Sequence, residues 1–332
     1  MARALRQAAP VQWVGLVGVF CATLVLGAAD APAPPPPTPT APAPPTAPNG
    51  SGPTNADGGD EPKGSGDPSD IPTLPVTIQL GPDGLPVIPE KYLSVIDPRF
   101  VTAQKTLDLQ AVVKYFENLY RADSSIAEAK LTVIRPDSAR TLSMKIWSRG
   151  ENKALVVITD PPREKNTATL KVDRNLWNYL PRIKRTIRIP PAMMLQAWMG
   201  SDFTNDDLVR ESSYSKDYTY TLVGATAKPP GWLVRFTAKP GVVGLWQRFD
   251  VVLSPDGTLP IASRWYDRRG RLARELNWDE VKMLGGKKLP ARMTLIPTDE
   301  PGQKTILEYS SIQFNAAVDD AMFSLSRLEE QR

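Results

Sequence analysis

The chain has 332 residues, a formal net charge of +4 and no histidine. The absence of histidine excludes Ser-His-Asp and Cys-His catalysis as well as histidine-based zinc and haem sites. The mild positive charge is spread along the sequence, which argues against nucleic-acid binding and allows contact with an anionic membrane surface.

Residues 1–31 have the organisation of a secretory signal peptide. Two arginines precede an apolar run at residues 14–26, and small residues follow at Ala28, Ala29 and Ala31. The run is shorter than the roughly 20 residues that a spanning helix needs, so we expect cleavage near Ala29 or Ala31. An uncleaved inner-membrane anchor is the alternative. The only cysteine, Cys21, lies in the apolar run and follows the bulky Phe20, which argues against lipidation. Cleavage would then leave the mature chain without a thiol.

Residues 32–74 are rich in Pro, Ala, Thr, Gly and Ser and have almost no large apolar side chains until their end. Such a segment cannot bury enough surface to offset the entropy of ordering. We therefore predict a disordered linker, extended where it is rich in proline.

Residues 75–332 have the composition of a globular domain. Residues 106–121 predict one amphipathic helix, capped by Thr106 or Asp108, because their apolar side chains repeat at helical spacing. From about residue 127 the pattern alternates with a period of two, and a second helical piece is expected at 192–200. Short turns join the later predicted strands, which are 218–223, 232–238, 245–253, 261–266, 272–281, 289–296 and 305–314. This pattern predicts a mainly β fold, in which an antiparallel, strongly curved sheet wraps around a few helices.

Acidic residues leave two kinds of chemistry to consider. A carboxylate pair for glycoside hydrolysis could come from Asp250, Glu275, Asp279 or Glu280, although a solvated strand face is the simpler interpretation. The acid-rich stretch 202–207 is not an EF-hand, since such a loop needs Gly at its sixth position and Glu at its twelfth. Thr204 and Asp207 instead predict a capping box at a helix start. We expect no metal, no cofactor and no catalytic residue.

Aromatic and methionine side chains gather in one short region of the sequence. Methionine adapts to varied apolar shapes and aromatic rings supply large contact areas. This mixture suits a cavity for acyl chains, and a packed core is the alternative. Arg185, on the apolar face of a predicted strand at 182–189, could meet a phosphate or ester at the cavity rim, or could extend its charge into water. The other members of the set are Trp177, Tyr179, Met193, Met194, Trp198, Met199 and Phe203.

Residues 193–208 are a candidate lid or rim. The apolar residues end at Gly200, which tolerates backbone conformations that other residues resist. Gly200, Ser201 and Asp202 are the predicted hinge, because a short flexible joint between two ordered pieces is what a gate requires. A rigid connection within the core is the alternative.

Four stretches carry a resemblance to a known family: 177–181 (WNYLP), 182–189 (RIKRTIRI), 198–208 (WMGSDFTNDDL) and 319–325 (DDAMFSL). Over roughly residues 107–328 the chain resembles the outer membrane lipoprotein-sorting proteins of the LolA/LolB superfamily. One departure is Asn166, where glycine is expected. The resemblance implies a half-open antiparallel β-barrel covered by helices, with an apolar interior that receives acyl chains and no catalytic residue.

Together these features predict a periplasmic carrier, or chaperone, that shuttles lipoprotein or lipid acyl chains towards the outer membrane. An inner-membrane permease of the ABC or RND type is the expected donor, by analogy. The alternatives are a carboxylate-dependent carbohydrate-active enzyme and a structural envelope module that only docks to a partner.

Overall fold

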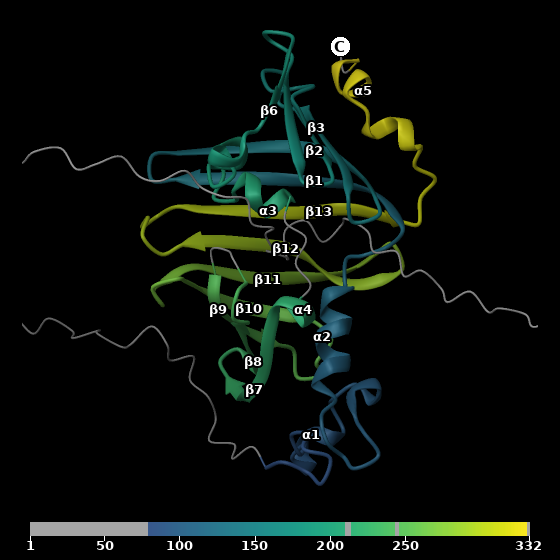
Figure 1. The fold of residues 1–332 in the computed structure, drawn as a ribbon, viewed down its shortest axis with the longest axis vertical. Helices are drawn as coiled ribbons and strands as arrows, with labels where there is room; N and C mark the ends of the chain where they lie inside the picture. Colours follow the sequence, from purple (N-terminus) through teal and green to yellow (C-terminus); the bar gives the residue numbers. More distant parts are fainter. Residues whose placement is uncertain (1–78, 210–213, 243–245, 331–332) are drawn as a thin grey trace, which may run out of the picture. The chain divides into compact units, whose positions relative to one another are not determined.

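The computed structural model describes residues 79–209, 214–242 and 246–330 (Figure 1). The predicted signal peptide and linker lie outside the described residues. Within those ranges, no helix is long and apolar enough to cross a membrane.

The described residues form one antiparallel sheet. Its order is β6-β5-β4-β3-β2-β1-β13-β12-β11-β10-β9-β8-β7. The strands are β1 (Ser124–Arg135), β2 (Ser138–Arg149), β3 (Lys153–Asp160), β4 (Ala168–Val172), β5 (Asn175–Leu180), β6 (Arg185–Arg188), β7 (Tyr218–Ala227), β8 (Pro230–Ala238), β9 (Trp246–Leu253), β10 (Pro260–Asp267), β11 (Leu272–Leu284), β12 (Lys287–Pro297) and β13 (Lys304–Phe314).

The sheet consists of two meanders that meet in the middle. The first leads outward from β1 to the edge strand β6, and the second returns from the opposite edge, β7, to β13. Pairing of β13 with β1 joins the meanders into one surface. Because β6 and β7 remain edges, the sheet is open, which confirms the predicted half-open antiparallel barrel.

Short helices accompany the sheet, and α2, α3 and α4 lie on the same face of it in Figure 1. The helix predicted at 106–121 is α2, which is shorter than expected, and its cap is Asp108, whose Oδ1 accepts a hydrogen bond from Ala111 N at 2.9 Å. The predicted helical piece at 192–200 is two separate 3-10 turns. The helical elements are α1 (Glu90–Leu93), η2 (Pro98–Phe100), α2 (Leu109–Glu117), η3 (Pro191–Met193), η4 (Trp198–Gly200), α3 (Asn205–Val209), α4 (Tyr214–Asp217), η5 (Asp320–Phe323) and α5 (Leu325–Glu329).

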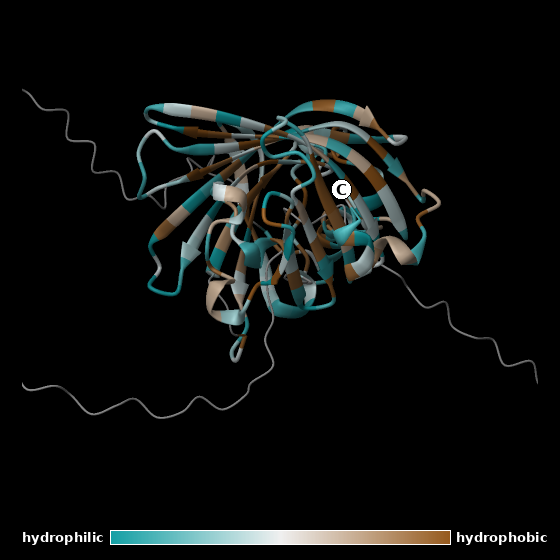
Figure 2. Cartoon of the chain, turned by 90° about the horizontal axis from the view of Figure 1, so that it is seen from above, coloured by the Kyte–Doolittle hydropathy of each residue, from teal (hydrophilic) through white to brown (hydrophobic). Residues whose placement is uncertain are grey.

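The sheet has a buried apolar layer on each of its two faces. Figure 2 shows the strands arching over the helices and loops, and the larger layer lies on this concave side, where it includes the buried face of α2. A smaller layer covers the outer side of β3, β4 and β5 and is closed by the C-terminal residues 316–328. Leu155 belongs to the outer layer and Val156 to the concave one, so β3 is buried on both faces. Double burial explains its unbroken apolar run.

The departure at Asn166 is accommodated by the backbone. Asn166 adopts a positive φ of 66°, in the turn between β3 and β4. Asparagine visits this left-handed region more readily than other non-glycine residues. The turn therefore keeps the conformation that glycine would favour.

Candidate functional site

The connection between the two meanders crosses the concave face of the sheet. Residues 189–209, which we name the crossover, leave the edge strand β6 and include η3, η4 and α3. Trp198 and Phe203 are its anchors in the apolar core, with side chains 0% and 1% exposed. The segment that the sequence marks as a lid is therefore packed into the core at its centre.

The centre of the crossover closes on itself. Trp198 N donates to Phe203 O at 2.7 Å, and Ala197 forms an isolated antiparallel bridge with Thr204. The tight closure requires left-handed backbone at two successive residues, Met199 with φ 52° and Gly200 with φ 68°. Glycine suits the second position because it has no Cβ to clash.

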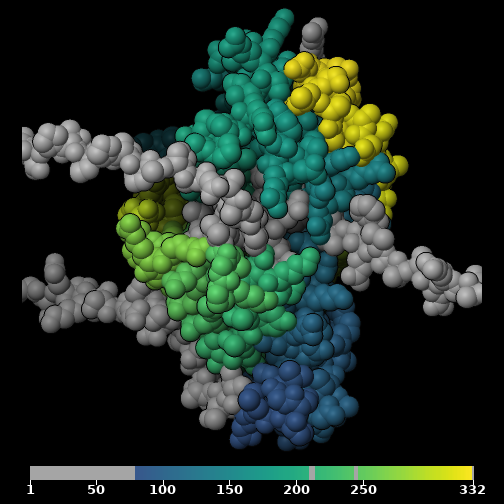
Figure 3. All heavy atoms as spheres, viewed as in Figure 1, coloured from purple at the N-terminus to yellow at the C-terminus, as the bar shows by residue number. Residues whose placement is uncertain are grey.

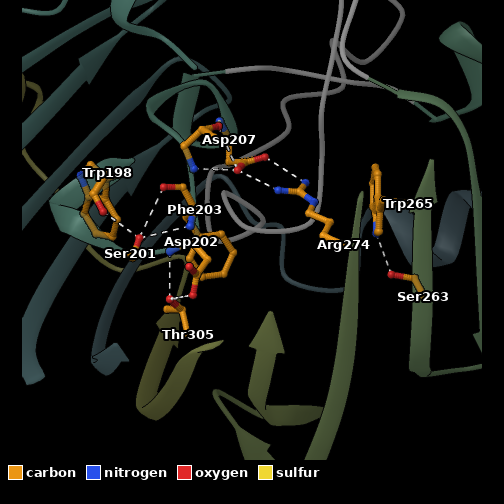
Figure 4. A network of polar contacts seen from close by, with 10 residues as sticks. Trp198, Ser201, Asp202, Phe203, Asp207, Ser263, Trp265, Arg274 and Thr305 are labelled. Atoms are coloured by element: carbon orange, nitrogen blue, oxygen red, sulfur yellow. Dashed lines mark hydrogen bonds and ion pairs between the residues drawn. The ribbon is translucent and has the colours of Figure 1, made fainter. Parts of the chain in front are cut away.

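Polar contacts fix this loop to β4, β1 and β13, and Figure 4 shows the contact of Asp202 with Thr305. Trp198 Nε1 donates to Thr169 Oγ1 on β4 at 3.1 Å. Asp202 Oδ2 accepts from Thr305 Oγ1 on β13 at 2.6 Å, and Asp202 Oδ1 lies 3.0 Å from Arg135 Nη2 at the end of β1. Each contact joins residues far apart in the sequence. The loop therefore connects strands that do not precede or follow it directly in the chain.

A buried ion pair fixes the end of the crossover to β11. Arg274 Nη1 and Nη2 donate to the two carboxylate oxygens of Asp207 at 2.9 and 3.0 Å. Asp207 also accepts from Thr204 N at 2.9 Å while Thr204 Oγ1 accepts from Asp207 N at 3.2 Å, which confirms the predicted capping box. Burial alone would raise the pKa of Asp207, but the charge and hydrogen bonds of Arg274 outweigh it and lower that pKa.

Aromatic rings surround the Arg274 guanidinium and continue across the second meander. The guanidinium carbon lies 4.5 Å from the ring centre of Trp246 and 5.1 Å from that of Trp265. Trp265 stacks on Phe249 at 4.3 Å, and Phe249 stacks on Phe236 at 4.5 Å. We name Phe236, Phe249 and Trp265 the aromatic row; it crosses β8, β9 and β10.

Helices α2 and α4 cover the aromatic row. Tyr214 of α4 lies 5.2 Å from Phe249, and the ring of Phe116 in α2 stacks on Tyr214 at 5.4 Å. Polar contacts also tie the two helices, because Ser215 N and Oγ donate to Glu117 Oε1 and Oε2 at 2.8 and 3.3 Å. Lys239 Nζ of the segment after β8 also donates to Ser215 O and Lys216 O at 3.1 and 2.7 Å, so the cover combines stacked rings with hydrogen bonds.

The structure brings together only part of the predicted acyl-binding set. Trp198 and Phe203 lie in the concave core, and Met194 and Met199 pack against it, while Met193 is exposed. Of the predicted hinge residues, Gly200 is exposed, Ser201 is buried and Asp202 is half-buried.

Trp177, Tyr179 and Arg185 lie elsewhere. Successive side chains of β5 point to opposite faces of the sheet, so Leu176 enters the concave core while Trp177 and Tyr179 join the outer layer. Arg185 is exposed at the start of the edge strand β6, and the strand predicted at 182–189 is shorter because 181–184 form a turn. The eight side chains are therefore not one cluster.

The acids considered for glycoside hydrolysis are paired with arginines on facing strands. Asp250 pairs with Arg235 at 2.8 Å and Glu275 with Arg264 at 2.9 Å. Arg292 contacts both remaining acids, Asp279 and Glu280. In the described ranges, no cluster of three or more acids or cysteines could hold a metal ion.

Sequence reasoning missed Arg274 and the aromatic row. The alternating pattern of the expected strands places Phe236, Phe249 and Trp265 on their apolar faces, and this pattern was the signal that could have found them. Strand order was needed to place the three rings beside one another.

A family model described as an uncharacterized protein matches residues 150–330. The chain belongs to this family. No curated protein matches the sequence.

Solved structures identify the fold. A DUF1329 family protein from Desulfovibrio piger is 22% identical with a TM-score of 0.59, covering 65% of this chain and 96% of its own. A domain assigned to the outer membrane lipoprotein-sorting proteins, from Vibrio parahaemolyticus, is 21% identical with a TM-score of 0.56 and covers 67% and 96%. The LolA superfamily protein NE2245 from Nitrosomonas europaea is 20% identical with a TM-score of 0.54 and covers 66% and 98%. The fold is LolA-like, as the sequence resemblance implied.

Proposed function

We propose that the protein is a non-enzymatic periplasmic carrier that binds acyl chains of lipoproteins or lipids against the concave face of its sheet and shuttles them towards the outer membrane. One observation carries the proposal. The concave face is a continuous apolar surface that extends from Trp198 and Phe203 to the aromatic row. The similarity to LolA-superfamily structures supports it by analogy of fold.

An acyl chain has to displace part of the cover, because the side chains on the concave face are buried. Each CH₂ group transferred from water contributes about 0.8 kcal/mol, so a long chain supplies several kcal/mol. An acyl chain can replace apolar contacts, but it cannot replace ion pairs or hydrogen bonds. The cover formed by α2 and α4 meets the aromatic row through the rings of Tyr214 and Phe116, contacts that an acyl chain can replace, and it is the proposed opening.

The crossover then forms the fixed wall of the site. Trp198, Phe203, Met194 and Met199 offer apolar surface from this wall. The competing version keeps Gly200, Ser201 and Asp202 as the hinge of a moving lid. That version has a defined cost, since the contacts of Asp202 and Asp207 must break before the lid can open.

The donor in this proposal is an inner-membrane permease of the ABC or RND type. The carrier takes up the acyl chain at that membrane and releases it to an acceptor with higher affinity. No residue has to perform a covalent step. The acids available for glycoside hydrolysis are held in arginine pairs, which gives a purely structural reason for their positions.

Binding is tested with a fluorescent fatty-acyl probe. The folded protein should bind the probe saturably, and phospholipid should displace it. Absence of saturable binding would reject the carrier. Stereospecific glycan cleavage by the purified protein would instead support the alternative of a carbohydrate-active enzyme.

Two reversible locks then distinguish the two openings. Both use a Cys21→Ser background, so that only the introduced cysteines can pair. Glu117→Cys with Ser215→Cys joins α2 to α4, and Asp202→Cys with Thr305→Cys joins the crossover to β13, each at side chains that already share a hydrogen bond. Oxidation of the first pair should slow probe uptake, and reduction should restore it. Slowing by the second pair alone would establish the crossover as the lid.

A further inference from the structure

The turn between β5 and β6 combines positive charge with exposed apolar side chains. We name residues 181–188 the basic hairpin; they comprise the turn 181–184 and strand β6. Ile183, within the turn, is 57% exposed. In Figure 1 this part of the chain projects beyond the end of the sheet that carries β6, and Figure 3 shows it at the surface beside the C-terminal residues.

The charge of this stretch of sequence has one sign, although the fold brings one acid of α5, Glu329, to Thr186 Oγ1 at 2.9 Å. There is no Asp or Glu between Asp173 and Asp202. The cations of the basic hairpin are all exposed, and within the described residues none of them forms an ion pair. They are Arg182, Lys184, Arg185 and Arg188.

Apolar side chains extend the patch. Ile187 of β6 is exposed, as are Met193 and Leu195 in the turns that follow, the latter at 54%. An apolar patch rimmed by charge usually marks an interaction surface. Cations next to apolar side chains match an anionic membrane, where phosphates lie outside and acyl chains inside.

A second exposed apolar pair has different charged neighbours. Val281 and Met283 on β11 are also exposed. Their charged neighbours are of both signs, and Lys282 is paired with Glu280 at 2.7 Å. On that surface acids neutralise part of the positive charge, since Glu280 and Asp279 also pair with Arg292.

We propose that the basic hairpin docks the protein on an anionic lipid membrane. The cations bind lipid phosphates, while Ile183 enters the boundary between headgroups and acyl chains. Docking through this turn leaves the concave face free, and it is independent of whether that face binds acyl chains. Arg185, which the sequence suggested for a phosphate or ester at a cavity rim, would then meet a lipid phosphate at the membrane instead.

The test uses a local reporter on the full chain, because the apolar run at residues 14–26 can bind vesicles by itself. Ile183→Cys in a Cys21→Ser background is labelled with an environment-sensitive dye, and Met283→Cys is the matched control. Vesicles of phosphatidylglycerol and phosphatidylethanolamine should shift the emission of the dye at 183 to the blue and leave the dye at 283 unchanged. The shift should weaken as salt rises, because salt screens exposed charges.

Charge variants measure how much the hairpin cations contribute to vesicle binding. Arg182→Gln, Lys184→Gln and Arg185→Gln together should weaken the vesicle dependence of the shift about a hundredfold, because each basic residue near an anionic surface contributes roughly fivefold. Lys130→Gln, Arg269→Gln and Lys288→Gln remove the same net charge from exposed positions elsewhere and should have little effect.

Three results would overturn the proposal. The first is an unshifted dye at 183 while the protein sediments with anionic vesicles. The second is an equal shift with neutral phosphatidylcholine vesicles. The third is an equal loss in both triple variants, which would assign binding to net charge. Failure of acyl-probe binding would leave this test unaffected, so the two proposals fail separately.

Discussion

Two neighbouring stretches, the basic hairpin and the loop at 197–207, are both rich in apolar and charged residues but have opposite surroundings. The hairpin exposes Ile183 and its cations. The loop buries Trp198 and Phe203, and its acids meet arginines from distant strands. The comparison teaches that a charged, apolar segment becomes core where the sheet supplies partners for its charges, and remains a surface where it does not.

The difference also separates two mechanical roles. The loop is held by side chains of β1, β4, β11 and β13, so it connects both halves of the sheet. The hairpin pairs with only one strand, β5, since β6 is an edge strand, and Thr186 Oγ1 donates to Glu329 Oε1 of α5 at 2.9 Å. The loop, with contacts on four strands, suits a fixed wall of the acyl-binding site. The projecting hairpin suits contact with a membrane.

The largest expected effect comes from breaking the partnership that distinguishes the loop. Arg274→Met leaves the Asp207 carboxylate buried without its partner, which typically costs about 3–5 kcal/mol in the free energy of unfolding. Urea denaturation measures the loss. Arg274→Met with Asp207→Leu is the control and should lose less, because replacing both members of a buried pair by apolar residues is often neutral. A loss below about 1 kcal/mol in the single variant would show that the pair does not fix the loop.

Acid should remove part of the same stabilisation. The folded-state pKa of Asp207 is lowered, so its contribution is present above the unfolded pKa of about 3.9 and is lost as pH falls through the folded pKa. Below about pH 4, the stability difference between wild type and Asp207→Asn should therefore shrink. Urea midpoints from pH 3 to 7 check this, and a difference that stays constant with pH would contradict it.

Much of the fold was predictable because it depends on local patterns. The helix with its Asp108 cap, the alternating strands and the Thr204–Asp207 box follow from spacings of a few residues. The unbroken apolar run of β3 reflects its burial on both faces. The run does not indicate, however, that the C-terminal residues 316–328 cover the outer face.

The site was less predictable because its contacts are distant in sequence. Nothing near Asp207 indicates that Arg274 will neutralise it, and the aromatic row forms only once three strands are paired. Trp177 and Trp198 look alike in sequence, yet the pleat of β5 sends Trp177 to the outer layer. Proximity along the chain is therefore a poor guide to which side chains share a site.

A smaller effect tests the backbone of the loop. Gly200→Ala should cost about 1–2 kcal/mol, because a left-handed conformation strains any residue with a Cβ. The new Cβ would also lie 3.3 Å from Arg140 Nη2. Gly286→Ala is the control, since φ there is 82° and a Cβ would meet nothing within 4 Å. An unchanged stability in Gly200→Ala would mean that this residue does not hold one conformation, which favours the hinge.

The smallest effect is expected where the hairpin cations are removed. Arg182→Gln, Lys184→Gln and Arg185→Gln together should change the free energy of unfolding by no more than about 0.5 kcal/mol, because exposed side chains away from structural contacts contribute little. The control variant with Lys130→Gln, Arg269→Gln and Lys288→Gln should show an equally small change in thermal and urea unfolding.

This near-zero result is informative because membrane binding by the same variant should fall about a hundredfold. Stability and binding would then separate at the hairpin, whereas in the loop a change at Arg274 has its main effect on stability. A loss above about 1 kcal/mol in the hairpin variant would show that its cations pair within the folded protein. The hairpin would then resemble the loop, and its charges would have an internal role in place of a membrane partner.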